Sequence, residues 1–335
     1  MDYFNYQDGQ LFAEEVSVAS LAQRFGTPCF IYSKASIEEQ YSAYEKSFKG
    51  HPSLICYAVK ANSNLAVLNV LAKLGAGFDI VSGGELDRVL AAGGNPKKVI
   101  FSGLGKTEDE IISGLKAKIH CFNIESEAEL YRINEIAKTQ DLVAPISIRV
   151  NPDVDAKTHP YISTGLKENK FGVPITSALN LYRQAANMVG VEVIGIDAHI
   201  GSQLTSIKPF LNSIDCLFVL IDQLEAEGIN LSHVDIGGGL GIKYEQEEPP
   251  KPSDLIRSVR KRFADRDLKI VIEPGRSIAA NAGIFVTRIE YLKSNNSKNF
   301  AIVDGGMNDL IRPALYGAWQ DIIPIRSSTS AAMKK

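Results

Sequence analysis

The sequence predicts a closed (β/α)8 TIM barrel joined to a second, β-rich domain that is incomplete in this chain. Short apolar segments of strand length recur eight times, and each is followed by polar or glycine-rich residues and then by a helical pattern. Strands that alternate with helices in this way form parallel βαβ units. Eight units over roughly 220 residues fit a closed barrel better than an open doubly wound sheet, which is the main alternative.

The expected strands and helices of the barrel follow one another along the chain. The strands are residues 54–59, 77–81, 99–102, 121–124, 145–150, 193–199, 233–236 and 269–272. Helical patterns between them cover residues 65–74, 84–92, 107–115 and 126–138. Ser126 and Glu129 have the spacing of a capping box, which predicts that the last of these helices begins there.

The residues on either side of the barrel differ in character. A helical pattern through Val16, Leu21 and Phe25 ends at Gly26. Residues 284–291 and 299–303 have the pattern of strands in an antiparallel element. We therefore expect the barrel to cover residues 30–278 and a partial β domain to consist of residues 1–29 and 279–335.

The composition is that of a globular protein and argues against several classes of partner. The 335 residues include 36 Lys or Arg and 39 Asp or Glu, which gives a net charge of −3. Because no basic block is present, we expect binding neither to nucleic acid nor to a membrane surface. The N-terminus lacks the pattern of a signal peptide and no apolar run approaches about 18 residues, so a cytoplasmic protein is expected. The widely spaced cysteines are expected to be reduced and to form no metal site: Cys29, Cys56, Cys121 and Cys216.

In a barrel of this kind, the reactive residues lie at the carboxyl ends of the strands. Lys60 follows the first expected strand, His199 ends the sixth and Glu273 follows the eighth. Glycine-rich segments follow the seventh and eighth strands. This concentration of ionisable and glycine residues predicts an active site at that rim.

Lys60 ends an apolar strand, and small and amide residues come next. We expect desolvation to disfavour the ammonium form and to lower the pKa of Lys60, which would make it an amine nucleophile able to form a Schiff base. The alternative is an ordinary lysine that carries its charge to solvent at the end of a strand.

Two loops are suited to bind a phosphate. Gly237, Gly238 and Gly239 follow the seventh strand, and Gly275 and Arg276 follow the eighth. Phosphate sites in such barrels are often built from these two loops, where backbone N–H groups approach the anion. A glycine run also occurs in tight turns, which is the alternative interpretation.

Glu273 and His199 have two interpretations each. A carboxylate at the end of an apolar strand needs a cation or a hydrogen-bond donor, and both a pyridinium N–H and Arg276 would satisfy Glu273. His199 is suited to stack on a ring or to act as an acid or base, and it is equally suited to a structural role.

Two later features extend the predicted site. Arg312 and Tyr316 lie four residues apart and would present a guanidinium and a phenol to a substrate carboxylate, or would pack at a domain junction. The polar stretch 158–167 would close over the site, or would form an ordinary solvated loop.

A lysine amine, a phosphate cradle, a carboxylate for a ring nitrogen and a stacking histidine together describe a site for pyridoxal 5'-phosphate. The segments that hold them resemble those of the fold-type III pyridoxal phosphate decarboxylases, which are related to alanine racemase. Residues 158–167 and 169–172 are similar to the diaminopimelate decarboxylases in that group. The matching segments are residues 57–62, 199–203, 237–241 and 273–276.

The resemblance implies a role for each matching residue. Lys60 would form the Schiff base, His199 would stack on the cofactor ring and Glu273 would contact the ring nitrogen. A carboxylate there keeps the ring protonated, which favours decarboxylation over racemisation. The implied phosphate contacts come from Gly237, Gly238, Gly239, Gly275 and Arg276, and the implied substrate contacts from Arg276, Arg312 and Tyr316.

The implied reaction converts meso-2,6-diaminopimelate to L-lysine and carbon dioxide, the last step of lysine biosynthesis, usually in a homodimer with shared active sites. Two alternatives stay open. One is a decarboxylase of ornithine, arginine or carboxynorspermidine, and the other is a protein that binds pyridoxal phosphate without turnover.

The chain departs from the family at its end. The resemblance implies about eighty further residues, far beyond ordinary loop variation, with a cysteine and a glutamate that reach the partner subunit's site. No cysteine follows Cys216 here. We therefore expect the 335-residue form to bind its cofactor weakly and to show little activity, and full turnover by this form would refute that expectation.

Overall fold

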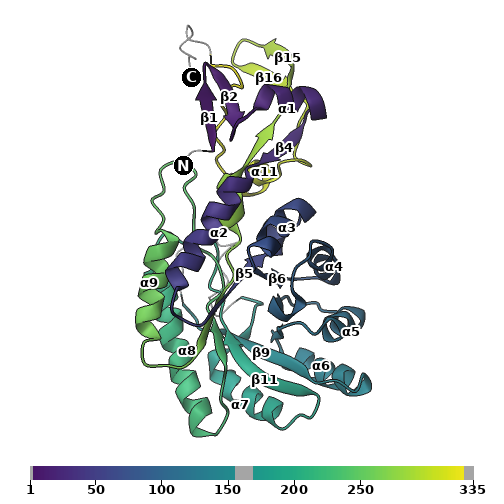
Figure 1. Cartoon of the computed structure of the whole chain (residues 1–335), viewed down its shortest axis with the longest axis vertical. Coiled ribbons are helices and arrows are strands. Elements are labelled where there is room, and N and C mark those ends of the chain that lie inside the picture. The colour runs from purple at the N-terminus through teal and green to yellow at the C-terminus, as the bar shows by residue number, and fades with distance from the viewer. Residues whose placement is uncertain (1–2, 155–168, 328–335) are drawn as a thin grey trace. The chain divides into compact units, whose positions relative to one another are not determined.

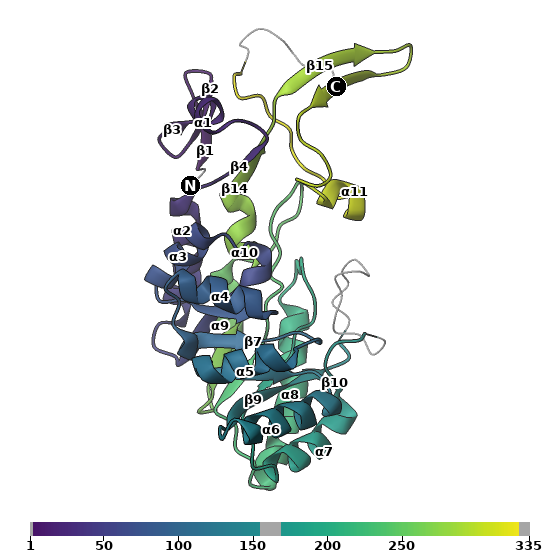
Figure 2. The same cartoon turned by 90° about the vertical axis from the view of Figure 1, so that its right-hand side faces the viewer.

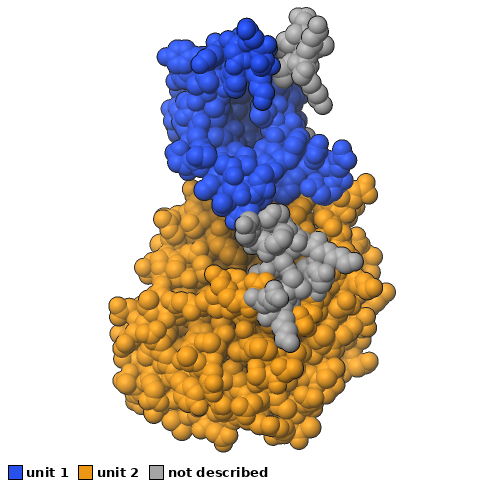
Figure 3. All heavy atoms as spheres, turned by 180° about the vertical axis from the view of Figure 1, so that it is seen from behind, with its two compact units in different colours: residues 1–37, 243–247, 281–335 blue, residues 38–242, 248–280 orange. Residues whose placement is uncertain are grey.

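A computed structural model describes residues 3–154 and 169–327 of the chain. The chain divides into two compact units, coloured separately in Figure 3. Unit 1 comprises residues 1–37, 243–247 and 281–335, and unit 2 comprises residues 38–242 and 248–280. Residues 30–37 and 243–247 thus group with unit 1, whereas the sequence analysis places them in the barrel domain.

Unit 2 contains a closed barrel of eight parallel strands (Figure 1). Each strand pairs in parallel with the next, and β13 pairs with β5, so the sheet closes on itself. This closure confirms the predicted barrel and rules out the open doubly wound sheet. The strands are β5 (Ser53–Ala58), β6 (Gly77–Ile80), β7 (Val99–Phe101), β8 (Cys121–Ile124), β9 (Ala144–Asn151), β11 (Val191–Asp197), β12 (His233–Asp235) and β13 (Lys269–Ile272).

Helices surround these strands (Figures 1 and 2). Most of the eight barrel strands are buried on both faces, which explains why they appear in the sequence as continuous apolar runs rather than as alternating ones. The helices are α2 (Lys34–Phe48), α3 (Leu65–Lys73), α4 (Gly83–Ala91), α5 (Glu108–Ala117), α6 (Glu127–Thr139), α7 (Ile175–Ala186), α8 (Lys208–Ala226), α9 (Pro252–Arg262) and α10 (Arg276–Ala279).

Side-chain caps fix where helices begin. The predicted cap of α6 is present, because the Ser126 hydroxyl accepts a hydrogen bond from the Glu129 N–H. The Glu129 carboxylate instead accepts from the Glu125 N–H, so the box is not reciprocal. A complete capping box occurs at α5, between Thr107 and Glu110.

Unit 1 is built from small antiparallel sheets and two short helices. Its core contains Leu11, Ala13, Val18 and Val286. The expected strand 284–291 is two strands, since β14 pairs with β4 and β15 pairs with β16. The elements are β1 (Phe4–Gln7), β2 (Gln10–Ala13), β3 (Val16–Ser17), α1 (Val18–Phe25), β4 (Cys29–Tyr32), β14 (Gly283–Val286), β15 (Ile289–Ser294), β16 (Asn299–Val303) and α11 (Arg312–Tyr316).

The helices of the described residues show no membrane-spanning candidate. None of them combines the length and the apolar character that crossing a bilayer requires.

A strand glycine makes room for a buried histidine in the barrel wall. The register of β11 shifts between Val193 and Gly195, and a Cβ on Gly195 would lie 2.1 Å from Nε2 of His233. Because His233 is fully buried, Gly195→Ala should lower the free energy of unfolding by about 1–3 kcal/mol, the usual cost of overpacking. Urea unfolding would measure this, with Gly105→Ala as the control, since a Cβ there meets no atom within 4 Å. Equal stability of the two variants would contradict the prediction.

Candidate active site

The structure places Lys60 and Glu273 at the same rim of the barrel. Lys60 lies in a short 3-10 turn (Val59–Ala61) that follows β5, and Glu273 directly follows β13. These two strands are hydrogen-bonded neighbours, with Ile272 paired to Ile55. The first and last expected strands of the barrel therefore bring the amine and the carboxylate to one site.

Lys60 forms an ion pair with Asp79 of β6. Its Nζ atom lies 3.0 Å from Asp79 Oδ2, and the Lys60 side chain is 49% exposed while the Asp79 side chain is buried. Desolvation lowers the pKa of Lys60, but the carboxylates of Asp79 and Glu273 outweigh it and raise the pKa above its ordinary value. The expectation that Lys60 is desolvated and has a lowered pKa is therefore wrong.

Glu273 belongs to a cluster of three buried carboxylates. Oxygen atoms of Glu273, Asp235 and Asp197 lie within 4.8 Å of one another. Burial and the neighbouring Asp235, Asp79 and Asp197 raise the pKa of Glu273 well above its ordinary value. This environment favours the protonated form of Glu273, whereas a neighbouring cation or strong donor would favour its ionised form.

Arg149 of β9 lies beside Asp197, one of the three carboxylates of this cluster. Its Nη1 atom lies 3.0 Å from Glu125 Oε1, and its Nε atom lies 3.8 Å from Asp197 Oδ2. Burial raises the pKa of Asp197 from 3.8 to about 7, although Arg149 lowers it in part. The two carboxylates thus share one guanidinium in the barrel interior.

The pKa of Asp197 predicts a pH dependence of stability. The folded chain retains a proton on Asp197 between about pH 4 and pH 7, where the unfolded chain has released it, so this group makes the free energy of unfolding fall as the pH rises through that window. Asp197→Asn should flatten the slope, as measured by urea unfolding at a series of pH values. Asp222→Asn, which alters an exposed ion pair with Arg266, should leave the slope unchanged. An unaltered slope in Asp197→Asn would contradict the assignment.

His199 presents its ring at this rim in a fixed tautomer. The Gly238 N–H donates to His199 Nδ1 at 3.2 Å, so the proton of the neutral imidazole is on Nε2. Burial and the positive charges of Arg149 and Lys60 lower the pKa of His199 well below its ordinary value. His199 is therefore neutral, which suits stacking on another ring better than a role that needs a positive charge.

The glycine run after β12 leaves no room for side chains. A Cβ on Gly238 would lie 2.1 Å from the Glu273 carbonyl oxygen, and one on Gly239 would lie 2.2 Å from the Gly201 carbonyl oxygen. Gly237 and Gly239 also have positive φ angles of 67° and 104°. Close packing against the neighbouring loops therefore requires glycine at these positions.

The N–H groups of these loops are not equally available to a ligand. The Gly237 N–H donates to Asp235 Oδ1 at 2.8 Å, and the Gly238 N–H is used by His199. The N–H groups of Gly239 and Gly275 have no acceptor among the described residues. The phosphate contacts of the three glycines stay a prediction, and Gly239 and Gly275 are the positions whose N–H groups have no acceptor among the described residues.

Arg276 is positioned beside this pair of loops. It begins α10, and its Nε and Nη2 atoms lie 3.2 and 3.1 Å from the hydroxyl oxygen of Ser202. The Ser202 hydroxyl thus holds the Arg276 guanidinium at the rim of the barrel.

Arg312 and Tyr316 lie in α11 of unit 1. The guanidinium carbon of Arg312 is 5.1 Å from the Tyr316 ring centroid and 6.0 Å from that of Tyr244. Their role as substrate ligands stays a prediction. The stretch 158–167, expected to close over the site, lies outside the described residues.

Three acidic residues of the site escaped the sequence analysis: Asp79, Asp197 and Asp235. Each lies within an apolar strand, two of them at its last position, and only the eighth strand's terminal carboxylate was singled out. A charged residue inside a run that is otherwise buried on both faces was the available signal, because such a residue needs a partner in the interior.

A family profile described as pyridoxal-dependent decarboxylase, pyridoxal binding domain, matches residues 34–280. A diaminopimelate decarboxylase of Vibrio cholerae is 60% identical over 328 residues, which cover 97% of this chain and 79% of that protein. A second one, from Aquifex aeolicus, is 48% identical over 97% of this chain and 77% of its own length.

Solved structures agree with these matches. A diaminopimelate decarboxylase of M. jannaschii superposes with a TM-score of 0.93 at 39% identity, covering 98% of this chain and 79% of that one. The Helicobacter pylori enzyme, solved in complex with L-lysine, gives a TM-score of 0.88 at 45% identity, covering 90% of this chain and 76% of that one. The chain belongs to the pyridoxal-dependent decarboxylases and, within them, to the diaminopimelate decarboxylase family.

Proposed function

We propose that this chain decarboxylates meso-2,6-diaminopimelate to L-lysine and carbon dioxide with pyridoxal 5'-phosphate as its cofactor. The observation that carries this proposal is the 60% identity to a diaminopimelate decarboxylase over 97% of the chain. The L-lysine complex of the Helicobacter pylori relative supports the same product.

The residues of the rim fit this cofactor. The buried Glu273 carboxyl has a raised pKa, and no lysine or arginine of the described residues lies within 4.0 Å of it, so a ring N–H would supply a donor. The close-packed glycine loop would let a phosphate approach the N–H groups of Gly239 and Gly275, which have no acceptor in the part of the chain that the structure describes, and Arg276 is a cation beside these loops. The exposed Lys60 amine is accessible for covalent attachment.

Each cofactor-binding residue has a defined task in the proposal. Lys60 attaches the cofactor, His199 lies against its ring, and Glu273 contacts the ring nitrogen. Gly237 and Gly238 shape the phosphate loop rather than donate to the phosphate, because both N–H groups already have acceptors. The phosphate is held by Gly239, Gly275 and Arg276.

Pyridoxal phosphate, when bound, supplies a protonated ring that accepts the electron pair released as carbon dioxide leaves. Glu273 keeps that ring protonated once it has ionised, since a carboxylate favours a bound N–H cation. Lys60 must lose a proton before its amine can attack, and Asp79 Oδ2 at 3.0 Å is the acceptor in hydrogen-bond range. Asp79 therefore holds and orients the Lys60 amine.

For substrate recognition, we propose that Arg276, Arg312 and Tyr316 bind the distal carboxylate and amine. Guanidinium groups suit this task because they hold carboxylates through paired hydrogen bonds.

We further propose a cytoplasmic homodimer. Tyr291 and Leu292 of β15 are more than 70% exposed, and large exposed apolar side chains are commonly covered by a partner. Light scattering on the purified chain would test the dimer.

A substrate panel tests the proposed reaction. A full-length version of the chain, supplied with pyridoxal phosphate, should release carbon dioxide and L-lysine from meso-2,6-diaminopimelate and should be far less active on ornithine, arginine and carboxynorspermidine. Preference for one of these amines would replace the proposed substrate. Visible absorbance of the bound cofactor without carbon dioxide release from any of them would instead indicate a binding protein.

A further inference from the structure

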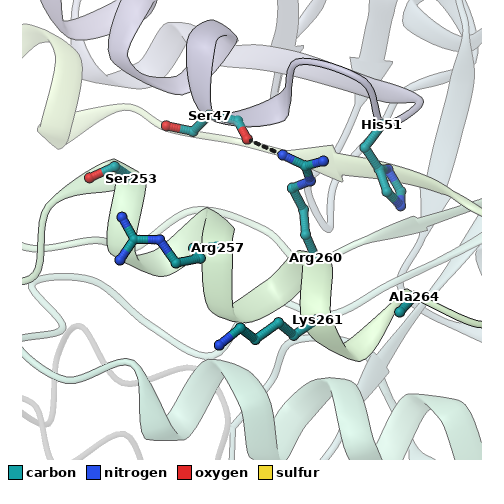
Figure 4. Close-up of a pocket in the computed structure, with 7 residues that line it drawn as sticks. All are labelled: Ser47, His51, Ser253, Arg257, Arg260, Lys261 and Ala264. Atoms are coloured by element: carbon teal, nitrogen blue, oxygen red, sulfur yellow. Dashed lines mark hydrogen bonds between the residues drawn. The ribbon is translucent and has the colours of Figure 1, made fainter.

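Unit 2 has a second pocket, away from the residues of the barrel rim, that is lined by basic and hydroxyl side chains (Figure 4). Its volume is about 520 Å³. That size falls in the range of small-molecule sites. The lining residues are Ser47, His51, Ser253, Arg257, Arg260, Lys261 and Ala264.

One face of α9 supplies most of this lining. Ser253, Arg257 and Lys261 are four residues apart, so they form a single row along the helix. Figure 4 shows Arg257 and Lys261 extending to the same side of α9, while Arg260 reaches toward Ser47. The opposite face, with Leu255, packs in the core. The helix thus points a hydroxyl and two cations into the pocket from one row.

These cations are only partly neutralised within the chain. Arg257 pairs with Asp254 at 3.3 Å, and Arg260 donates to the neutral Ser47 carbonyl oxygen at 3.0 Å. No carboxylate lies within 4.0 Å of the Lys261 amine among the described residues. Like charges four residues apart on a helix, as in Arg257 and Lys261, repel each other and destabilise the helix. An anion in the pocket would remove that repulsion.

The dipole of α9 does not explain the positions of all its basic residues. Cations in the last turn of a helix stabilise it, which would explain Arg260, Lys261 and Arg262. Arg257 lies outside that turn and still faces the pocket. Arg262 does not line the pocket and pairs with Asp215 at 3.4 Å instead. Among the described residues, Arg260 and Lys261 have no carboxylate within 4.0 Å, whereas Arg257, like Arg262, pairs with an aspartate.

We propose that this pocket binds a phosphate-bearing small molecule with more than one negative charge. Phosphate oxygens accept several charge-assisted hydrogen bonds, and Arg257, Arg260 and Lys261 supply donors from the same wall. Ser253 adds a hydroxyl donor. This site is separate from the cofactor phosphate loops and does not depend on the proposed decarboxylase reaction.

Calorimetric titration with inorganic pyrophosphate tests the proposal. The chain is first saturated with pyridoxal phosphate and then freed of excess cofactor, so that its own phosphate loops are occupied. Pyrophosphate should then bind saturably at one site per chain. Sodium chloride at matched ionic strength should give no saturable signal, which separates site binding from charge screening.

Two variants locate the binding. Arg257→Gln combined with Lys261→Gln should weaken pyrophosphate binding by about tenfold or more, the effect of losing charge-assisted hydrogen bonds. The control Arg262→Gln removes one charge from the same helix and should bind as the unaltered chain does. Circular dichroism confirms that each variant is folded. Absence of saturable binding, or equal weakening in the control and the double variant, would overturn the proposal.

Discussion

Lys60→Ala is expected to abolish retention of pyridoxal phosphate through gel filtration and to lower the decarboxylation rate by at least about 10²- to 10⁴-fold, the range that one positioned proton-transfer group contributes. The variant loses the attaching amine and its hydrogen bond to Asp79 at 3.0 Å. Cofactor absorbance after gel filtration and the rate of carbon dioxide release would measure the two effects separately.

The control for this prediction is another exposed lysine of the same unit. Lys73 lies in the last turn of α3, so Lys73→Ala should keep cofactor retention and turnover unchanged. Lys60→Arg keeps the positive charge beside Asp79 but offers no amine. If Lys60→Arg retained the cofactor as the unaltered chain does, charge alone would explain binding and the covalent role would be wrong.

Glu273→Ala is expected to lower kcat by about 10- to 150-fold, which corresponds to the 1.5–3 kcal/mol of a hydrogen bond to a charged group. Without this carboxylate, the bound ring nitrogen has no anion to keep it protonated, so the electron pair released with carbon dioxide is less stabilised. Covalent attachment through Lys60 should persist, and KM should change little.

Two further variants separate charge from contact. Glu273→Gln preserves the shape of the side chain without its charge, so its kcat should fall about as far as that of the alanine variant. Ser102→Ala removes a hydroxyl that lies 3.5 Å from Glu273 Oε1 and should have a much smaller effect. Full activity in Glu273→Gln would show that the negative charge is not needed.

The barrel could be predicted because its signals are local. Each barrel strand is a run of three to eight mostly apolar residues, with polar residues after it, and closure follows from the number of βαβ units. The small sheets of unit 1 were harder to predict, because β4 and β14 are far apart in the sequence and pair only in the folded chain. Nothing in residues 284–291 alone marks the change of partner between β14 and β15.

The site residues that follow the barrel strands could be predicted from the sequence. Lys60, His199, Glu273 and the glycine loops were found because reactive residues of such barrels follow the strands. The direction of the pKa shift of Lys60 could not be predicted, because it depends on Asp79, which lies inside the neighbouring strand. Which glycine N–H groups are free likewise depends on acceptors from other segments, such as His199 for Gly238.

Reduction with borohydride followed by peptide mapping tests the central claim most directly. The chain would be incubated with pyridoxal phosphate, reduced, digested and analysed by mass spectrometry. A Schiff base at this rim predicts a pyridoxyl group on the peptide that contains Lys60. A label on a different lysine, or no stable label at all, would contradict the assignment of Lys60 as the residue that attaches the cofactor.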